Sequence, residues 1–165
     1  MALFRSKTKV SPETFIEQES NKAMGETSEH LEVLFSACKT QVRSAKEVAM
    51  LCGFMPLLAM SLARLNRSIQ RDYAAAFGQK MDAAYGNPAG AQFQQRILEY
   101  LSAFGKDISD GQGDKFPSLM SAVLNNICGI SDDTVGRCRL GLLQFLLPSL
   151  RSDVEVFGKL KFVGS

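Results

Sequence analysis

The residues of this chain that could take part in acid–base or nucleophilic chemistry are few and scattered. The single histidine, His30, lies in the stretch GETSEHLEVL, where Glu26 would stand one helical turn before it. An imidazole–carboxylate pair without an adjacent nucleophile is thin support for catalysis, and a partly exposed histidine near a helix start explains the same residues. We therefore expect no catalytic residue, although a site assembled from distant Asp, Glu, Arg and Tyr side chains would leave no linear pattern.

The cysteines have the spacing of structural thiols. They are Cys38, Cys52, Cys128 and Cys138. They form no C-x-x-C motif and have no closely spaced histidine, so the sequence predicts neither a metal site nor a disulfide framework. We expect free buried thiols, no cofactor and a reducing, cytoplasmic location. The alternative is a reactive Cys138, because Arg137 and Arg139 flank it and would lower the pKa of an exposed thiol.

The stretch DISDGQGD, residues 107–114, is similar to a calcium-binding loop only in composition. Counted from Asp107, its glycine falls at the fifth position rather than the sixth, and the twelfth position is Ser118 rather than glutamate. We interpret this stretch as a mobile polar loop. The sequence contains no phosphate-binding loop, nucleophile elbow or dinucleotide fingerprint.

Six cations at helical spacing are the candidate anion-binding residues. They are Lys39, Arg43, Lys46, Arg64, Arg67 and Arg71. Their positions mirror one another about residue 55, so a chain reversal there would set them at three matching levels of a basic strip about 10–11 Å long. The strip has no interleaved aromatic residues for base stacking. A solvent-facing or neutralised basic surface is one interpretation, sequence-independent binding of RNA or DNA is a second, and an acidic protein or anionic membrane surface is a third.

Charge is divided unevenly along the chain. Residues 36–80 hold seven positive and two negative charges, whereas residues 11–35 hold one positive and six negative charges. The formal net charge of +2 is therefore no guide to a partner.

The elements that must position these residues centre on VAMLCGFMPLLAMSLA, residues 48–63, which carry no charge. Apolar residues recur at alternating spacings of four and three from Leu31 to Cys52, a pattern typical of a long helix. Gly53 stands where a helix C-cap is expected, and Pro56 suits the first turn of a new helix. We predict an antiparallel helical hairpin, about 28–52 and 56–85, that bends near residue 55. A kinked continuous helix is the alternative, and no stretch has the 18 apolar residues of an ordinary transmembrane helix.

Both predicted arms are apolar nearly all round at the bend, so other helices or another subunit must cover them. The candidate partner-binding residues there are Met50, Phe54, Met55, Leu57 and Met60. Methionine side chains adapt well to a partner surface.

Capping signals predict the remaining elements. Ser11 and Pro12 begin a helix that fades near Gly25, and Asn87 and Pro88 begin another that stops at Gly105. Two further helices are expected, one that ends at Gly129 and one from about 131 to Pro148. Residues 151–165 are ambiguous between a last helix and a small β-hairpin.

These elements predict an all-α, single-domain bundle of about six helices. Residues 1–10 would form a flexible basic N-terminus without the apolar region of a signal peptide, 11–150 the bundle, and 151–165 a tail packed on or beside it. The predicted function is non-enzymatic protein–protein binding as a homo-oligomer. Sequence-independent binding of RNA or DNA is the alternative, and peripheral membrane association is the third hypothesis.

Overall fold

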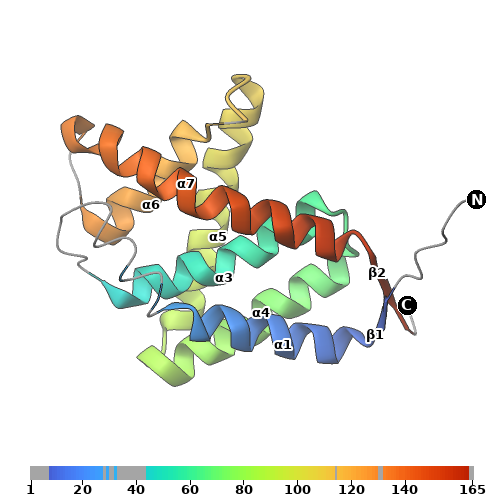
Figure 1. Cartoon of the computed structure of the whole chain (residues 1–165). Helices are drawn as coiled ribbons and strands as arrows, with labels where there is room; N and C mark the ends of the chain where they lie inside the picture. Colours follow the sequence, from blue (N-terminus) through green and yellow to red (C-terminus); the bar gives the residue numbers. More distant parts are fainter. Residues whose placement is uncertain are drawn as a thin grey trace, which may run out of the picture.

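A computed structural model describes residues 8–27, 29, 32, 44–113, 115–129 and 132–163 (Figure 1). Within them lie six helices and two short strands. The helices are α1 (Pro12–Gly25), α3 (Ala45–Leu62), α4 (Arg67–Tyr85), α5 (Ala89–Ser109), α6 (Pro117–Cys128) and α7 (Asp132–Phe157); the strands are β1 (Thr8–Val10) and β2 (Leu160–Phe162). This arrangement confirms the predicted all-α bundle.

Helix α3 is the centre of the bundle. It contacts each of the other five described helices, which lie around it in Figure 1. The helix begins at Ser44, whose side chain accepts a hydrogen bond from the amide of Glu47, and 12 of its 18 residues are buried. The uncharged stretch is therefore the core helix, covered by this chain's own helices.

The predicted bend at Gly53 and Pro56 is wrong, because α3 runs straight through both residues. Gly53 is a packing glycine: the ring of Phe77 fills the space where a side chain would stand, at 2.2 Å from an ideal Cβ. A proline inside a helix removes one backbone hydrogen bond and disturbs the carbonyls one turn before it. Here the hydroxyl of Tyr73 donates to the Gly53 carbonyl at 3.1 Å. The alternative, a kinked continuous helix, is correct in that one helix spans both residues.

The chain reverses direction after the C-terminal end of α3, between Ala63 and Asn66. Arg64 adopts a left-handed backbone conformation there (φ 58°), and the Leu65 amide donates to the Met60 carbonyl. Asn66 caps α4 by accepting from the amide of Ser68 at 2.9 Å. The second arm ends at Tyr85 as predicted. Most of the first predicted arm, 28–52, falls outside the described residues.

Several predicted helix boundaries are confirmed. Ser11 caps α1 with Pro12 in its first turn, and that helix ends at Gly25. Helix α6 ends at Cys128, with Gly129 as a left-handed cap (φ 59°).

Two predicted helix stops are wrong. Helix α5 continues through Gly105 to Ser109, and α7 continues through Pro148 to Phe157. In α7 the buried side chains Leu142, Leu146 and Leu150 continue on one face across the proline. Burying the two apolar side chains beyond the proline, Leu150 and Phe157, stabilises by roughly 1.5–3 kcal/mol each, and together they offset a proline penalty of about 3 kcal/mol.

Two helices are capped by carboxylates from the preceding helix rather than by their own N-cap residues. Asp82 of α4 accepts from the Gly90 amide at 2.8 Å. Asp107, 1% exposed, accepts from the amides of Ser118 and Leu119 at 2.8 and 2.9 Å. The expectation that Asp107 belongs to a mobile loop is therefore wrong: it lies in the last turns of α5 and fixes the start of α6.

The two strands close the fold, and the predicted tail is neither a separate helix nor a hairpin. β1 and β2 pair in parallel, with Thr8 opposite Leu160 and Val10 opposite Phe162. The Phe15 ring packs edge-on against Phe157 and Phe162, with centroids 5.2 Å apart in each pair. Residues 8–10 of the segment expected to be flexible are thus held in a strand.

Helix α3 is the one described helix that is long and apolar enough to cross a membrane, judged on length and composition alone. However, 67% of it is buried inside the bundle. The core helix of a bundle has the same length and composition, so these properties are explained by its central position.

Candidate functional site

Among the residues that the structure describes, those that could take part in acid–base or nucleophilic chemistry form no catalytic arrangement. His30 and Cys38 lie outside them, and Cys52, Cys128 and Cys138 are all buried. Burial raises the pKa of the Cys52 thiol to about 12. The reactive-thiol alternative for Cys138 is therefore not supported, since that residue is 2% exposed.

The buried tyrosines are also poor acid–base groups. Burial raises the pKa of Tyr73 and of Tyr100, so neither phenol ionises near neutral pH. Within the described ranges, no three His, Cys, Asp or Glu side chains gather in a way that could hold a metal ion.

The structure does not join the six candidate cations into one strip. Lys39 and Arg43 lie outside the described residues. Lys46 stands in the first turn of α3, whereas Arg64 follows the opposite end of that helix, about 24 Å away at 1.5 Å per residue. The mirror arrangement needed a bend at residue 55, and α3 has none there. Arg67 and Arg71 lie in the first turns of α4, which begins shortly after Arg64. These three cations therefore follow the end of α3 that is opposite to Lys46.

The proposed apolar binding residues are part of the core. Met50, Phe54 and Met60 are completely buried, and Leu57 is 7% exposed. Met55 is partly buried and packs against the same core. The apolar excess that suggested a partner at the bend is covered by helices of this chain, which removes the basis for shallow membrane insertion at that point as well.

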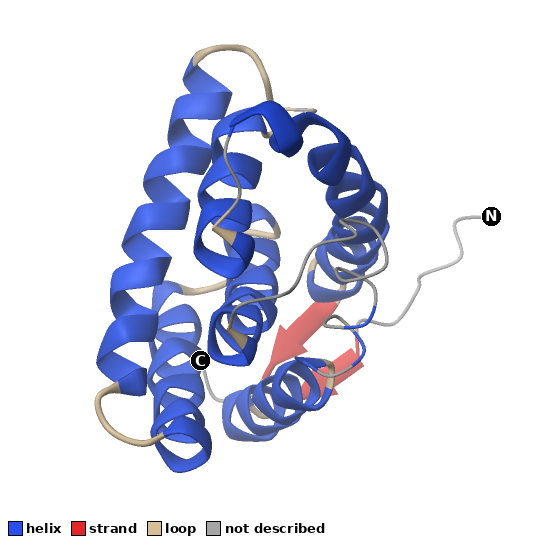
Figure 2. Cartoon of the chain, turned by 90° about the vertical axis from the view of Figure 1, so that its left-hand side faces the viewer, coloured by secondary structure: helices blue, strands red, loops and turns tan. Residues whose placement is uncertain are grey.

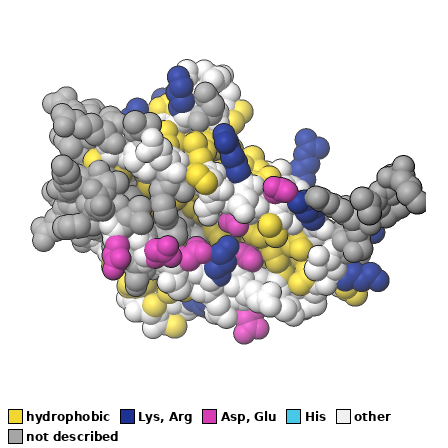
Figure 3. All heavy atoms as spheres, in the orientation of Figure 1, with side chains coloured by type: hydrophobic (Ala, Val, Ile, Leu, Met, Phe, Trp, Pro, Cys, Tyr) yellow, Lys and Arg dark blue, Asp and Glu magenta, His cyan; other side chains and the backbone are white. Residues whose placement is uncertain are grey.

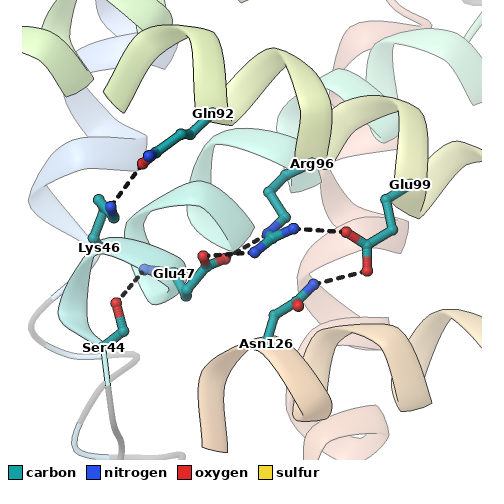
Figure 4. A network of polar contacts seen from close by, with 7 residues as sticks. All are labelled: Ser44, Lys46, Glu47, Gln92, Arg96, Glu99 and Asn126. Carbon is teal, nitrogen blue, oxygen red and sulfur yellow. Dashed lines mark hydrogen bonds and ion pairs between the residues drawn. The ribbon is translucent and has the colours of Figure 1, made fainter. Parts of the chain in front are cut away.

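A polar network joins the first turn of α3 to α5 and α6. Figure 4 shows Arg96 between Glu47 and Glu99, with its guanidinium 2.8–2.9 Å from both Glu47 oxygens and 2.8 Å from Glu99. Glu99 also accepts from the Asn126 amide at 2.9 Å. The hydrogen bonds to Glu47 raise the pKa of Arg96 above its ordinary value. Because its charged members are paired with one another, we interpret the network as a structural tie.

Lys46 supports the same junction. Its ammonium donates to the Gln92 side chain at 2.6 Å, as Figure 4 also shows. This contact holds α3 against α5 and directs the Lys46 charge into the helix junction.

An acidic cluster lies where α1 meets α7. Lys22 stands 3.4 Å from Asp153 and 3.9 Å from Glu26. Figure 3 shows a row of acidic side chains interrupted by a basic one across this face. Burial raises the pKa of Glu19, and the Lys22 charge offsets this only in part. The ion pair of Lys22 with Asp153 ties α1 to α7, and we interpret the cluster as a structural contact.

The feature best suited to binding is an apolar groove beside the C-terminal end of α3. It has a volume of about 440 Å³ and lies between α7 and the connection from α5 to α6. Its walls are Leu62, Gly113, Phe116, Leu147, Leu150, Arg151, Val154 and Glu155. Figure 3 shows apolar side chains gathered above α7 on this side of the molecule. We call these eight residues the α7 groove.

The floor and rim of the α7 groove differ in exposure. Phe116 and Leu150 are buried and form its floor, whereas Leu62 is 43% exposed at its edge. The groove was not predicted from the sequence, because the chain was expected to bend near residue 55 and the last helix to end at Pro148. The continued apolar spacing from Leu147 to Val154 was the available signal.

A second groove, of about 550 Å³, lies between α1 and α4. Its walls mix the carboxylates Glu13, Glu17 and Asp72 with alanines and with Lys80, which donates to Asn21 at 2.7 Å. Its lining contains fewer large apolar side chains than the α7 groove: Ile16, compared with Leu62, Phe116, Leu147, Leu150 and Val154. We therefore regard the smaller α7 groove as the candidate site.

Comparison with known proteins adds no relative: no family model, curated protein or solved structure matches this chain.

Proposed function

We propose that this chain is a non-enzymatic helical protein that works by binding another protein through the α7 groove. The observation that carries the proposal is an open groove of about 440 Å³ with a floor of Phe116 and Leu150 and an exposed Leu62 at its edge. Exposed apolar surfaces of this kind mark interaction sites in folded proteins. The described cysteines are buried, and the charged side chains that join α3 to α5 are paired with one another.

The shape of the α7 groove suits an amphipathic helix as the partner segment. One wall is the helix α7, and Leu147, Leu150 and Val154 follow one another at spacings of three and four along it. A partner helix presents apolar anchors at the same spacings, so the two rows can interdigitate.

The rim charges favour an acidic partner. Arg151 is exposed on the groove wall and forms no ion pair with any described residue. Glu155, one turn further along α7, is paired with Lys159. Both Arg151 and Glu155 line the groove, and Glu155 has Lys159 as a partner. A helix with leucine anchors and a glutamate placed beside Arg151 would complement the apolar floor and this cation.

The experiment measures binding of a fluorescein-labelled amphipathic peptide of leucine and glutamate heptads by fluorescence anisotropy. We expect saturable binding, with the affinity reduced about tenfold or more by Leu62→Lys, since an apolar anchor contact is worth more than about 1.4 kcal/mol. Arg151→Glu should also weaken binding. The loss of affinity should be larger at low ionic strength than at high, because salt screens the charge interaction.

Val163→Lys is the matched control, because Val163 is 56% exposed and lies after β2, outside the groove. A scrambled peptide of the same composition controls for nonspecific adhesion. Equal affinity for both peptides, or an affinity unchanged by Leu62→Lys in a folded variant, would overturn the proposal.

A further inference from the structure

The two strands fix the side from which the chain enters the fold. β1 and β2 pair in parallel, with Thr8 opposite Leu160, and a turn at 158–159 joins α7 to β2. Because parallel strands point the same way, the residues before Thr8 join the pair from the same side as those before Leu160, which is the α7 side. Figures 1 and 2 show β1 and β2 side by side, and in Figure 1 they lie beyond the end of α7. Residues 1–7 are therefore attached at the C-terminal end of α7.

The α7 groove begins within reach of that attachment point. Gly158, the first residue after α7, donates its amide to the Val154 carbonyl at 3.0 Å, and Val154 lines the groove. From Thr8 across the strand pair and back along the turn, the path to Val154 is at most about 20 Å. Seven extended residues span up to about 23 Å, at roughly 3.3 Å per residue. Residues 1–7 are thus long enough to reach the groove from Thr8 without any change in the described helices.

The composition of residues 1–7, MALFRSK, suits the α7 groove. Leu3 and Phe4 are adjacent large apolar side chains, and the floor of the groove is the apolar pair Phe116 and Leu150. A volume of about 440 Å³ lies within the range of sites that bind compact apolar groups. The second groove, between α1 and α4, is a less suitable destination, because α1 follows the other end of β1.

We propose that residues 1–7 bind the α7 groove of their own chain, with Leu3 and Phe4 against Phe116 and Leu150. The inference rests on the proposed function, because it assigns a regulation to the same groove: the segment competes with the partner helix. A segment tethered at Thr8 competes at an effective concentration on the order of millimolar, without any second molecule. A partner helix therefore binds only as it displaces the segment.

The first experiment compares backbone amide chemical shifts of the full chain with those of the double variant Leu3→Ser/Phe4→Ser, without peptide. We expect shift changes at Leu150 and Val154, because the groove loses its apolar occupant. Ser6→Ala is the matched control within the same segment and should leave the groove unchanged. Unchanged groove shifts in the double variant, or changes confined to α1 and α4, overturn the inference. Groove shifts that vary with protein concentration show binding by a second copy, which also overturns it.

The second experiment measures the affinity of the leucine–glutamate peptide for the same two chains by fluorescence anisotropy. Removing an intramolecular competitor raises the fraction of open grooves, so we expect the double variant to bind the peptide about threefold more tightly, or more. Equal affinity of the two chains overturns the inference and leaves the proposed function standing. If neither chain binds the peptide, the proposed function fails, and the shift comparison still decides whether the segment occupies the groove.

Discussion

Asp107 shows how one buried side chain can determine the start of an element. Both of its carboxylate oxygens accept backbone amides of the first turn of α6, and the helix has no capping side chain of its own. Negative charge at a helix N-terminus is favourable, and each hydrogen bond to a buried carboxylate is worth roughly 1.5–3 kcal/mol.

We expect Asp107→Ala to lower the free energy of unfolding by about 3 kcal/mol, because it leaves two amides without an acceptor. Asp107→Asn keeps one acceptor oxygen and should lose less. Urea denaturation measures both. The exposed neighbour Asp110 is the control, and Asp110→Ala should change stability by no more than about 0.5 kcal/mol. Equal effects at the two aspartates would contradict the capping role.

Glu19 gives a second prediction at this scale, concerning pH. Burial raises its pKa in the folded protein, so folding favours the protonated form and the ionised form destabilises the folded state. At low pH the carboxyl is protonated in both states and Glu19→Gln should leave stability unchanged. As the pH rises through the carboxyl range, the variant should become more stable than the parent chain, and thermal melts from pH 3 to pH 8 measure the difference. A variant that is less stable at pH 7 would show that the ionised carboxylate is favourable in the fold.

At the scale of elements, glycine has different structural roles at different positions: one glycine lies in close packing inside a helix and another lies at a helix end. Gly53 receives the ring of Phe77, and a Cβ there would lie 2.2 Å from that ring, whereas a Cβ at Gly25 would meet nothing within 4 Å. Local sequence rules treat both as helix stops, and only Gly25 is one.

Gly53→Ala should therefore destabilise the protein by roughly 1–3 kcal/mol through overpacking in the middle of α3. Gly25→Ala should be neutral or stabilising by at most about 1 kcal/mol. Chemical denaturation of the two variants provides a matched comparison. A harmless Gly53→Ala would mean that α3 and α4 do not approach as closely as the structure places them.

The sequence predicts elements better than it predicts their continuity. Ser11, Gly25, Tyr85 and Gly129 are predicted boundaries that the structure confirms, because each signal acts within one helical turn. Gly53, Gly105 and Pro148 look like stops locally and are not, because the packing of distant residues decides each case. The hydroxyl of Tyr73 at Gly53 comes from 20 residues away.

For the molecule as a whole, the wrongly predicted bend at residue 55 also affected the candidate sites that were predicted from it. A bend there would have exposed Met50 and Met60 and brought Lys46 level with Arg64. The continuous α3 instead buries the methionines and separates Lys46 from Arg64 by nearly its full length. The apolar spacing from Leu147 to Val154 signals that the last helix continues, but it does not locate the α7 groove, which depends on which helix surfaces the other helices leave uncovered.

The central claim is that the α7 groove binds an amphipathic helix, and backbone amide chemical shifts during titration with the leucine–glutamate peptide test it most directly. The largest shift changes should map to Leu62, Phe116, Leu150 and Val154, which lie on three separate segments of the chain around one groove. Changes that are absent, or that map instead to α1 and α4, would contradict it.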